Sequence, residues 1–93
     1  MSRRKKKAEV HEQTIAQALV VLKDVSEDTT TPRNIRRNAK NAMNALHESA
    51  NTYAVQCANA ISLLDEVSQD PNMPSYTRTR IWNIVSLLET VKD

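Results

Sequence analysis

Few side chains in this sequence are suited to covalent or metal chemistry. The candidates are one cysteine, Cys57, and two histidines, His11 and His47. A thiol nucleophile needs an activating base, and a zinc site needs four ligands. Neither histidine lies at triad or ligand spacing from Cys57 or from a carboxylate. We therefore expect no catalytic residue, metal site, cofactor or small-molecule substrate, and a protein that is not an enzyme.

Composition excludes several large classes of protein. The 93 residues include no glycine, which phosphate-binding loops, dinucleotide fingerprints and nucleophile elbows all need. A single cysteine cannot form an internal disulfide. No apolar run approaches the roughly 18 residues that span a bilayer, and none follows the basic amino end as a secretory signal would. We expect a cytoplasmic protein with no membrane association.

Basic side chains near the amino terminus are the first candidates for binding phosphate. Residues 8–93 hold eight basic and 11 acidic residues, so the net charge of +2 comes from a short run near the start. Such a run stays solvated, either as a frayed extension of the first helix or as an arm that binds polyanions. We expect residues 1–8 to form a basic, flexible tail. Its candidate contacts are Arg3, Arg4, Lys5, Lys6 and Lys7.

A second basic group begins at Arg33. Arg36, Arg37 and Lys40 follow it at helical spacing, so all four fall on one face. Together with the tail, this face would suit an RNA or a ribosomal surface. Aromatic residues make up only 3% of the chain and provide no stacking platform, so such binding would be directed to the phosphate backbone.

The elements that position these residues are predicted from an internal repeat. A shift of 42 residues aligns Val21–Asp28 with Leu63–Asp70, and the matches continue at Pro32 with Pro74. Each half of the chain is therefore predicted to form a helix, a turn and a second helix. The period falls in the range of HEAT and armadillo repeats, and the shared pattern Asp-x3-Pro-x3-Arg resembles the HEAT turn.

Apolar residues recur at helical spacing and predict four helices, over residues 9–27, 32–47, 52–69 and 74–91. Pro32 and Pro74 should start helices, with the Thr31 hydroxyl as a cap and with Asp28 and Asp70 accepting turn amides. The predicted fold is all-α: a four-helix bundle of two duplicated hairpins, forming one domain over residues 9–93. The pattern does not decide between a closed bundle and an open stack of hairpins.

The repeat also offers a structural role for two arginines. Arg36 and Arg78 are 42 residues apart, as are Asp28 and Asp70. These arginines are therefore expected to pair with the aspartates across the turns. The positions equivalent to Arg33, Arg37 and Lys40 are not basic, which leaves these three as the better candidates for nucleic-acid contact.

Trp82 and Leu87 widen the apolar surface of the fourth helix beyond one stripe. Because position 82 is equivalent to Lys40, we expect Trp82 at the edge of the core, filling space there or anchoring a partner. The leading hypothesis is a protein-interaction module, acting on a partner protein or by self-association. A small RNA- or ribosome-associated protein is the alternative.

Three segments carry a resemblance to a known family: Pro32–Arg37, Asp70–Pro74 and Arg80–Ser86. They resemble uncharacterised protein family 0147, a family of short archaeal helical proteins, over roughly residues 15–90. The resemblance implies a compact four-helix fold. It brings no activity, cofactor or catalytic residue to any position of this chain.

Overall fold

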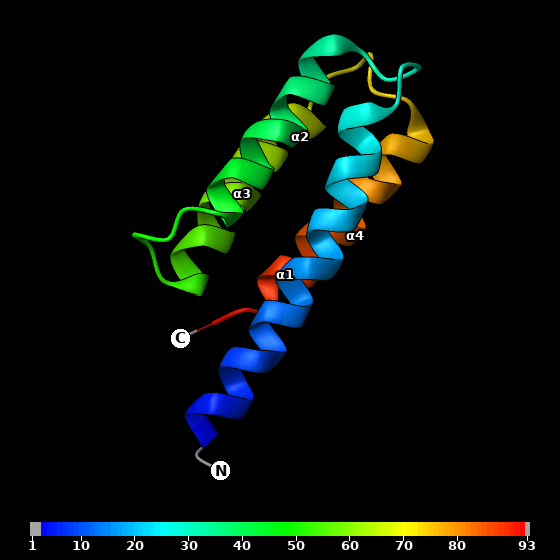
Figure 1. Cartoon of the computed structure of the whole chain (residues 1–93). Coiled ribbons are helices and arrows are strands. Elements are labelled where there is room, and N and C mark those ends of the chain that lie inside the picture. The colour runs from blue at the N-terminus through cyan, green and yellow to red at the C-terminus, as the bar shows by residue number, and fades with distance from the viewer. Residues whose placement is uncertain (1–2, 93) are drawn as a thin grey trace.

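The computed structural model describes the backbone of residues 3–92 and the side chains of residues 8–92. This part of the chain forms four helices, shown in Figure 1: α1 (Arg3–Glu27), α2 (Arg33–Leu46), α3 (Tyr53–Ser68) and α4 (Ser75–Glu89). The all-α prediction is confirmed, and the predicted bounds of α2, α3 and α4 agree to within two residues. None of these helices is both long and apolar enough to cross a bilayer.

The two proline-led helices begin where the sequence predicts. The carbonyl oxygens of Pro32 and Pro74 accept the first helical N–H bonds, from Arg36 and Arg78. The predicted capping by Thr31 is wrong, because no side chain caps α2. Thr31 turns into the core instead, where it is 2% exposed and its hydroxyl has no partner.

The first helix is longer than predicted. α1 begins at Arg3, so the expected boundary between a tail of residues 1–8 and a domain starting at residue 9 is not a break in secondary structure. Lysine, arginine and alanine favour helix, and no glycine or proline interrupts this segment. The side chains of residues 3–7 lie outside the described residues.

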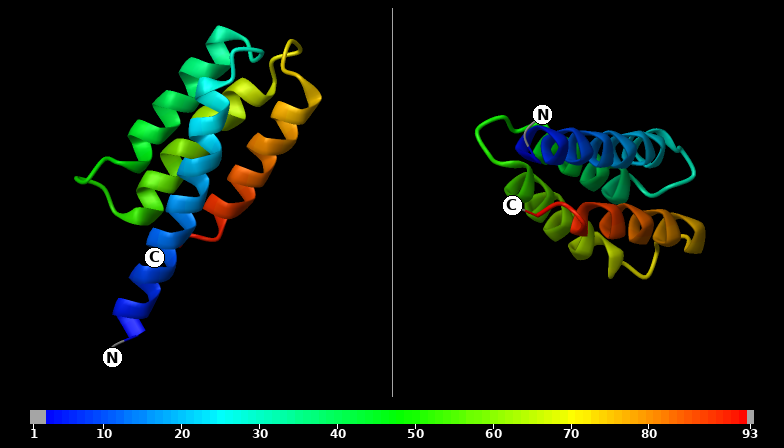
Figure 2. Two further views of the ribbon diagram at one scale, coloured as in Figure 1. Left: turned by 45° about the vertical axis from the view of Figure 1, so that its right-hand side comes forward. Right: turned by 90° about the horizontal axis from the view of Figure 1, so that it is seen from below.

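The four helices close into a bundle rather than an open stack. Each helix packs on two others, in the ring α1, α2, α3, α4 and back to α1. The α1–α2 hairpin forms one layer and the α3–α4 hairpin the other, as the right-hand view of Figure 2 shows. The chain measures 47 Å along the bundle and 22 × 20 Å across it.

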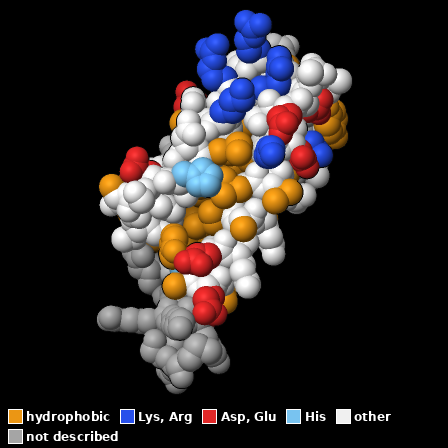
Figure 3. All heavy atoms as spheres, in the orientation of Figure 1, with side chains coloured by type: hydrophobic (Ala, Val, Ile, Leu, Met, Phe, Trp, Pro, Cys, Tyr) orange, Lys and Arg blue, Asp and Glu red, His pale blue; other side chains and the backbone are white. Residues whose placement is uncertain are grey.

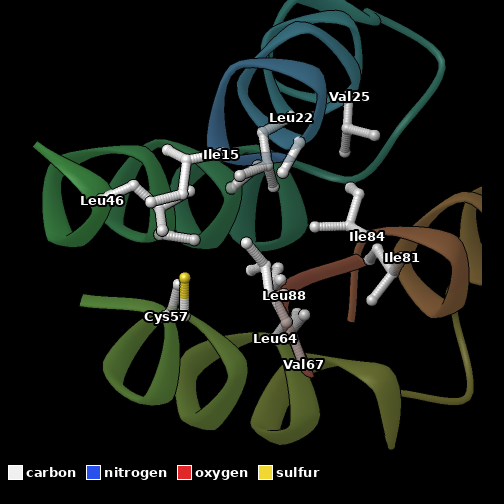
Figure 4. Close-up of a cluster of buried hydrophobic side chains, with 14 of the residues drawn as sticks. Ile15, Leu22, Val25, Leu46, Cys57, Leu64, Val67, Ile81, Ile84 and Leu88 are labelled. Carbon is white, nitrogen blue, oxygen red and sulfur yellow. The ribbon is translucent and has the colours of Figure 1, made fainter. Parts of the chain in front are cut away.

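The core lies between the two layers, and the predicted apolar stripes supply most of it. Figure 4 shows side chains from all four helices pointing into this space. Leu22 and Leu64, which are 42 residues apart, are both 0% exposed. Small and large residues alternate between the halves, because Ala39 and Ala42 of α2 are equivalent to Ile81 and Ile84 of α4. The small side chains of α2 are thus matched by larger side chains on α4.

Leu64 gives a direct test of this core. Replacing it with alanine should lower the free energy of unfolding by about 2–5 kcal/mol, because the lost methyl groups leave a cavity. Val55→Ala is the matched control on the same helix, because Val55 is 42% exposed and its change should stay within about 0.5 kcal/mol. Urea denaturation followed by circular dichroism measures both. Equal losses in the two variants would contradict the packing described here.

Candidate functional site

Trp82 lies on the outer face of α4. It is 59% exposed, the second most exposed of the large apolar side chains of residues 8–92, after Val20. Exposed small polar side chains surround it at neighbouring helical positions, including Ser75, Thr79 and Ser86. Leu87 is half-buried. It follows Trp82 by five residues, so the two side chains point in directions about 140° apart around the helix axis. The two residues predicted to form one contact surface therefore face different directions.

The cationic face of α2 is present as predicted. Arg33, Arg37 and Lys40 are exposed, whereas Arg36 is half-buried. Figure 3 shows Lys and Arg side chains gathered around the start of α2. The start of α1, where the sequence places the other five cations, lies at the opposite end of the bundle (Figure 1). The two basic groups therefore do not join into one surface patch.

The predicted ion pairs across the turns are wrong. Within residues 8–92, neither Arg36 nor Arg78 pairs with a carboxylate. Arg78 Nη2 instead donates to the backbone carbonyl oxygen of Asp70 at 3.2 Å. The buried Nε of each arginine has no hydrogen-bond partner among the described atoms. The aspartate carboxylates accept hydrogen bonds from other donors instead.

Those donors join the two turns of the bundle. Asp28 Oδ2 accepts a hydrogen bond from the Tyr76 hydroxyl at 2.7 Å, and Asp70 Oδ2 accepts one from Asn34 Nδ2 at 2.6 Å. Positions 28 and 70 are 42 apart, and so are positions 34 and 76. Each turn therefore contacts the second helix of the other hairpin in the same way. This reciprocity is that of a twofold axis along the bundle. We define these two hydrogen bonds as the turn junction.

Each aspartate also accepts bonds within its own turn, as predicted. Asp28 Oδ1 accepts from the backbone N–H and the hydroxyl of Thr30, at 2.9 and 2.6 Å, and Asp70 Oδ1 accepts from the N–H of Asn72 at 2.9 Å. The Thr30 hydroxyl, then Tyr76 and the Thr30 amide, lower the pKa of Asp28 from 3.8 to about 2. The Asn72 amide and then Asn34 lower the pKa of Asp70. Both carboxylates are held in their charged form.

Asn34 and Tyr76 were not predicted as contacts, although the sequence contains a signal for them. Both are hydrogen-bond donors, and they stand 42 residues apart on the second helix of each hairpin. They fix the starts of α2 and α4, the helices that carry the cationic face and Trp82. Because positions 40 and 82 are related by the same axis, Lys40 and Trp82 lie on opposite sides of the bundle.

A groove of about 850 Å³ opens at the other end of the bundle, away from the turn junction. Its walls are α1, the end of α2, the α2–α3 connection and the start of α3. Figure 3 shows hydrophobic side chains exposed in a strip between α1 and α2. The apolar lining consists of Ala8, Ile15, Ala16, Leu19 and Leu46. We call this feature the α1 groove.

Both histidines line the α1 groove, although sequence spacing does not relate them. His11 Nε2 lies 3.0 Å from the carbonyl oxygen of Lys92, and its ring meets the Tyr53 ring edge-on. The Tyr53 hydroxyl donates to Glu12 Oε1 at 2.7 Å, which raises the pKa of Tyr53. Within residues 8–92, no group of three His, Cys, Asp or Glu side chains is placed to hold a metal ion.

Cys57 lies in the core, where it points toward Leu46 in Figure 4. It is 1% exposed. Burial raises the pKa of its thiol from 9.0 to about 11. Because the thiolate is the reactive form, this thiol is held in its unreactive state at neutral pH. Cys57 therefore serves as a small apolar residue of the core.

Comparison with known proteins places the chain among proteins without an assigned activity. The profile of an uncharacterised protein family, UPF0147, matches residues 1–91. A UPF0147 protein of Sulfurisphaera tokodaii is 54% identical over 83 residues, covering 89% of this chain and 93% of that protein. One of Aeropyrum pernix is 53% identical over 83 residues, covering 89% of this chain and 91% of its own.

Two crystal structures share the fold. A protein of unknown function, MMP1188, is 51% identical to this chain with a TM-score of 0.84, covering 86% of this chain and 91% of its own. A UPF0147 protein from Thermoplasma acidophilum is 31% identical, also with a TM-score of 0.84, covering 90% of this chain and 99% of its own.

The turn junction predicts a specific acid response. Because the folded pKa of Asp28 is about 2, below its ordinary 3.8, the stabilisation from its carboxylate is complete above about pH 4 and disappears as the pH falls through 2. Tyr76→Phe removes one donor and should raise this pKa toward 3.8. Carboxyl NMR titration measures it. Tyr53→Phe, which loses only a bond to Glu12, should leave Asp28 unchanged. An unaltered Asp28 midpoint in Tyr76→Phe would refute the junction.

Proposed function

Because the chain belongs to uncharacterised protein family UPF0147, whose name states no activity, we propose its function from its own surface. It is a cytoplasmic, non-enzymatic helical module that binds a partner protein through Trp82 on α4. Exposure of the Trp82 indole is the observation that carries this proposal. The partner provides an apolar pocket for that ring.

The fold itself does not require an aromatic side chain at position 82. The equivalent position on α2 is Lys40, which is also exposed and supports the same helix packing. Tryptophan is enriched among the residues that dominate binding energy at protein interfaces. The small side chains around it, such as Thr79 and Ser86, leave the indole free to enter the apolar pocket of the partner. Leu87 takes no part in this surface because it faces another direction.

The non-enzymatic part of the proposal is supported by the state of the reactive groups. The thiol of Cys57 is buried and has a raised pKa. The ring of His11 bonds a backbone carbonyl, and Glu12 accepts the Tyr53 hydroxyl. These contacts give each group a structural role and bring no base to a nucleophile.

Site-specific crosslinking in the source cells tests the Trp82 surface. A photo-crosslinking amino acid at Ser86 should yield one discrete protein adduct, and Trp82→Ala in the same chain should abolish it. The matched control is the same probe at Asn44, the position equivalent to Ser86 on α2, which should not yield that adduct. Trp82→Ala should change the free energy of unfolding by less than about 0.5 kcal/mol, because the side chain is exposed.

Adducts at Ser86 that persist without Trp82 would rule out the proposed anchor. An adduct with twice the mass of the chain would identify the partner as a second copy. In that case the module self-associates through α4.

A second candidate function is binding of an RNA phosphate backbone, as a free RNA or on a ribosomal surface. The observation in its favour is the exposure of Arg33, Arg37 and Lys40 on one side of α2, none of them in an ion pair with a described residue. The basic segment 3–7 would act separately, because it starts at the other end of the bundle.

Salt dependence tests this second function. Three phosphate contacts to single-stranded RNA predict that log K falls with log salt concentration with a slope of about −2 from α2 alone. Replacing Arg33, Arg37 and Lys40 with alanine should remove that part of the slope, and deleting residues 1–7 should reduce the remainder. Fluorescence anisotropy from 50 to 300 mM salt measures both. No binding at 50 mM, or a slope that the triple variant leaves unchanged, counts against RNA.

A further inference from the structure

We propose that the partner of Trp82 is a second copy of this chain, bound through an antiparallel pairing of the two α4 helices. This inference rests on the proposed function, because it uses the same surface and identifies the protein that occupies it. The contact surface is a row of four residues on α4, which we call the α4 stripe: Arg78, Trp82, Val85 and Glu89. The order of charged and apolar side chains in this stripe determines the partner.

The α4 stripe has the spacing of a seam between two helices. Its members follow one another at steps of four, three and four residues, so they lie within about 60° of one another around the helix axis. Trp82 and Glu89 are exposed, and Arg78 and Val85 are half-buried, so each side chain is at least partly accessible. Alternating steps of three and four are the spacing with which two helices pack along one seam. The stripe can therefore pack on a second helix over about three turns.

Antiparallel pairing makes the α4 stripe complementary to itself. If a twofold axis crosses the helix between residues 83 and 84, position 82 of one copy lies opposite position 85 of the other, and position 78 lies opposite position 89. Trp82 then packs on Val85 of the second copy, and Arg78 faces Glu89 of the second copy. Twofold symmetry repeats both contacts. The apolar pairs lie at the centre of the seam, with an ion pair at each end.

Arg78 and Glu89 are available for this pairing. Within residues 8–92, neither is in an ion pair. Arg78 Nη2 donates to the carbonyl oxygen of Asp70 at 3.2 Å, which leaves further N–H groups of the guanidinium for a carboxylate. A parallel pairing would place arginine opposite arginine and glutamate opposite glutamate. Repulsion between like charges disfavours that arrangement, so the charges select the antiparallel direction.

The equivalent surface of α2 cannot pair with itself in this way. The positions 42 residues earlier hold Arg36, Lys40, Met43 and His47, with no acidic side chain among them. Two copies of that row would bring basic side chains together without an opposite charge. The internal repeat therefore provides self-complementarity on α4 alone, and α2 supplies a matched control.

Sedimentation equilibrium of the full chain provides the test. In about 50 mM salt, the mass should rise from 10.5 kDa at about 1 μM toward twice that value at about 500 μM. An interface of one helix per copy is small, so we expect a Kd on the order of 10–100 μM. Trp82→Ala should weaken dimerisation at least about tenfold. Trp82 is the single tryptophan of the chain, so its fluorescence should shift to shorter wavelength as the dimer forms.

Charge reversal tests the direction and register of the pairing. Arg78→Glu and Glu89→Arg should each weaken the homodimer about tenfold, because each change creates two like-charge pairs. An equimolar mixture of these two variants should dimerise again, since each ion pair then joins opposite charges. Circular dichroism verifies that both variants are folded. Lys40→Glu, the matched charge reversal on α2, should leave dimerisation unchanged.

Three results would overturn the inference. They are a wild-type chain that stays monomeric up to about 500 μM, a dimer that Trp82→Ala leaves unchanged, and a mixture of the two folded charge variants that does not dimerise. A monomeric chain that still gives a Trp82-dependent adduct with a different protein at Ser86 would overturn this inference and leave the proposed function intact. Absence of any Trp82-dependent adduct at Ser86 would overturn both.

Discussion

The structure depends on the burial of two apolar hairpin faces against each other about a twofold axis. A helical hairpin cannot bury its apolar face alone. Leu22 of the first hairpin and Leu64 of the second are both fully buried in the core that the two layers form together. At one end of that interface the turn junction adds two equivalent polar contacts, from Tyr76 to Asp28 and from Asn34 to Asp70. The apolar faces provide the driving force, and the directional hydrogen bonds set the register in which the faces meet.

The same axis explains why the surface features are separate. Equivalent positions on α2 and α4 point away from each other, so the cationic face and Trp82 cannot contribute to one site. Differences between equivalent residues of α2 and α4 also show which positions the fold does not constrain. Inside the bundle, the small volume of alanine on α2 is offset by the larger volume of isoleucine on α4. Lys40 and Trp82 lie outside the core, so their volumes need not match. Binding functions are therefore expected at the outer positions.

Much of this fold could be predicted from the sequence, because helical spacing of apolar residues and helix-starting prolines are local signals. The predicted stripes are buried or packed on the core, and α2 begins directly after Pro32. The ion pairs of Arg36 and Arg78 were predicted wrongly, because the repeat places an aspartate and an arginine on either side of each turn. In the structure, shorter hydrogen bonds from Tyr76 and Asn34 already bind those carboxylates. Such contacts depend on how the hairpins face each other, which no local pattern encodes. The shared groove of His11 and His47 was missed for the same reason.

The α1 groove lies where the two halves differ most. Residues 3–10 of α1 correspond, at a distance of 42, to residues 45–52, which include the connection between α2 and α3. The first hairpin thus continues as helix where the second begins with a loop. Had both halves been built alike, this end of the bundle would be symmetrical. Because α1 has extra turns, one side of the α1 groove is helix α1 and the other side is the α2–α3 connection. Ala8 and Ala16 of α1 line the groove between them.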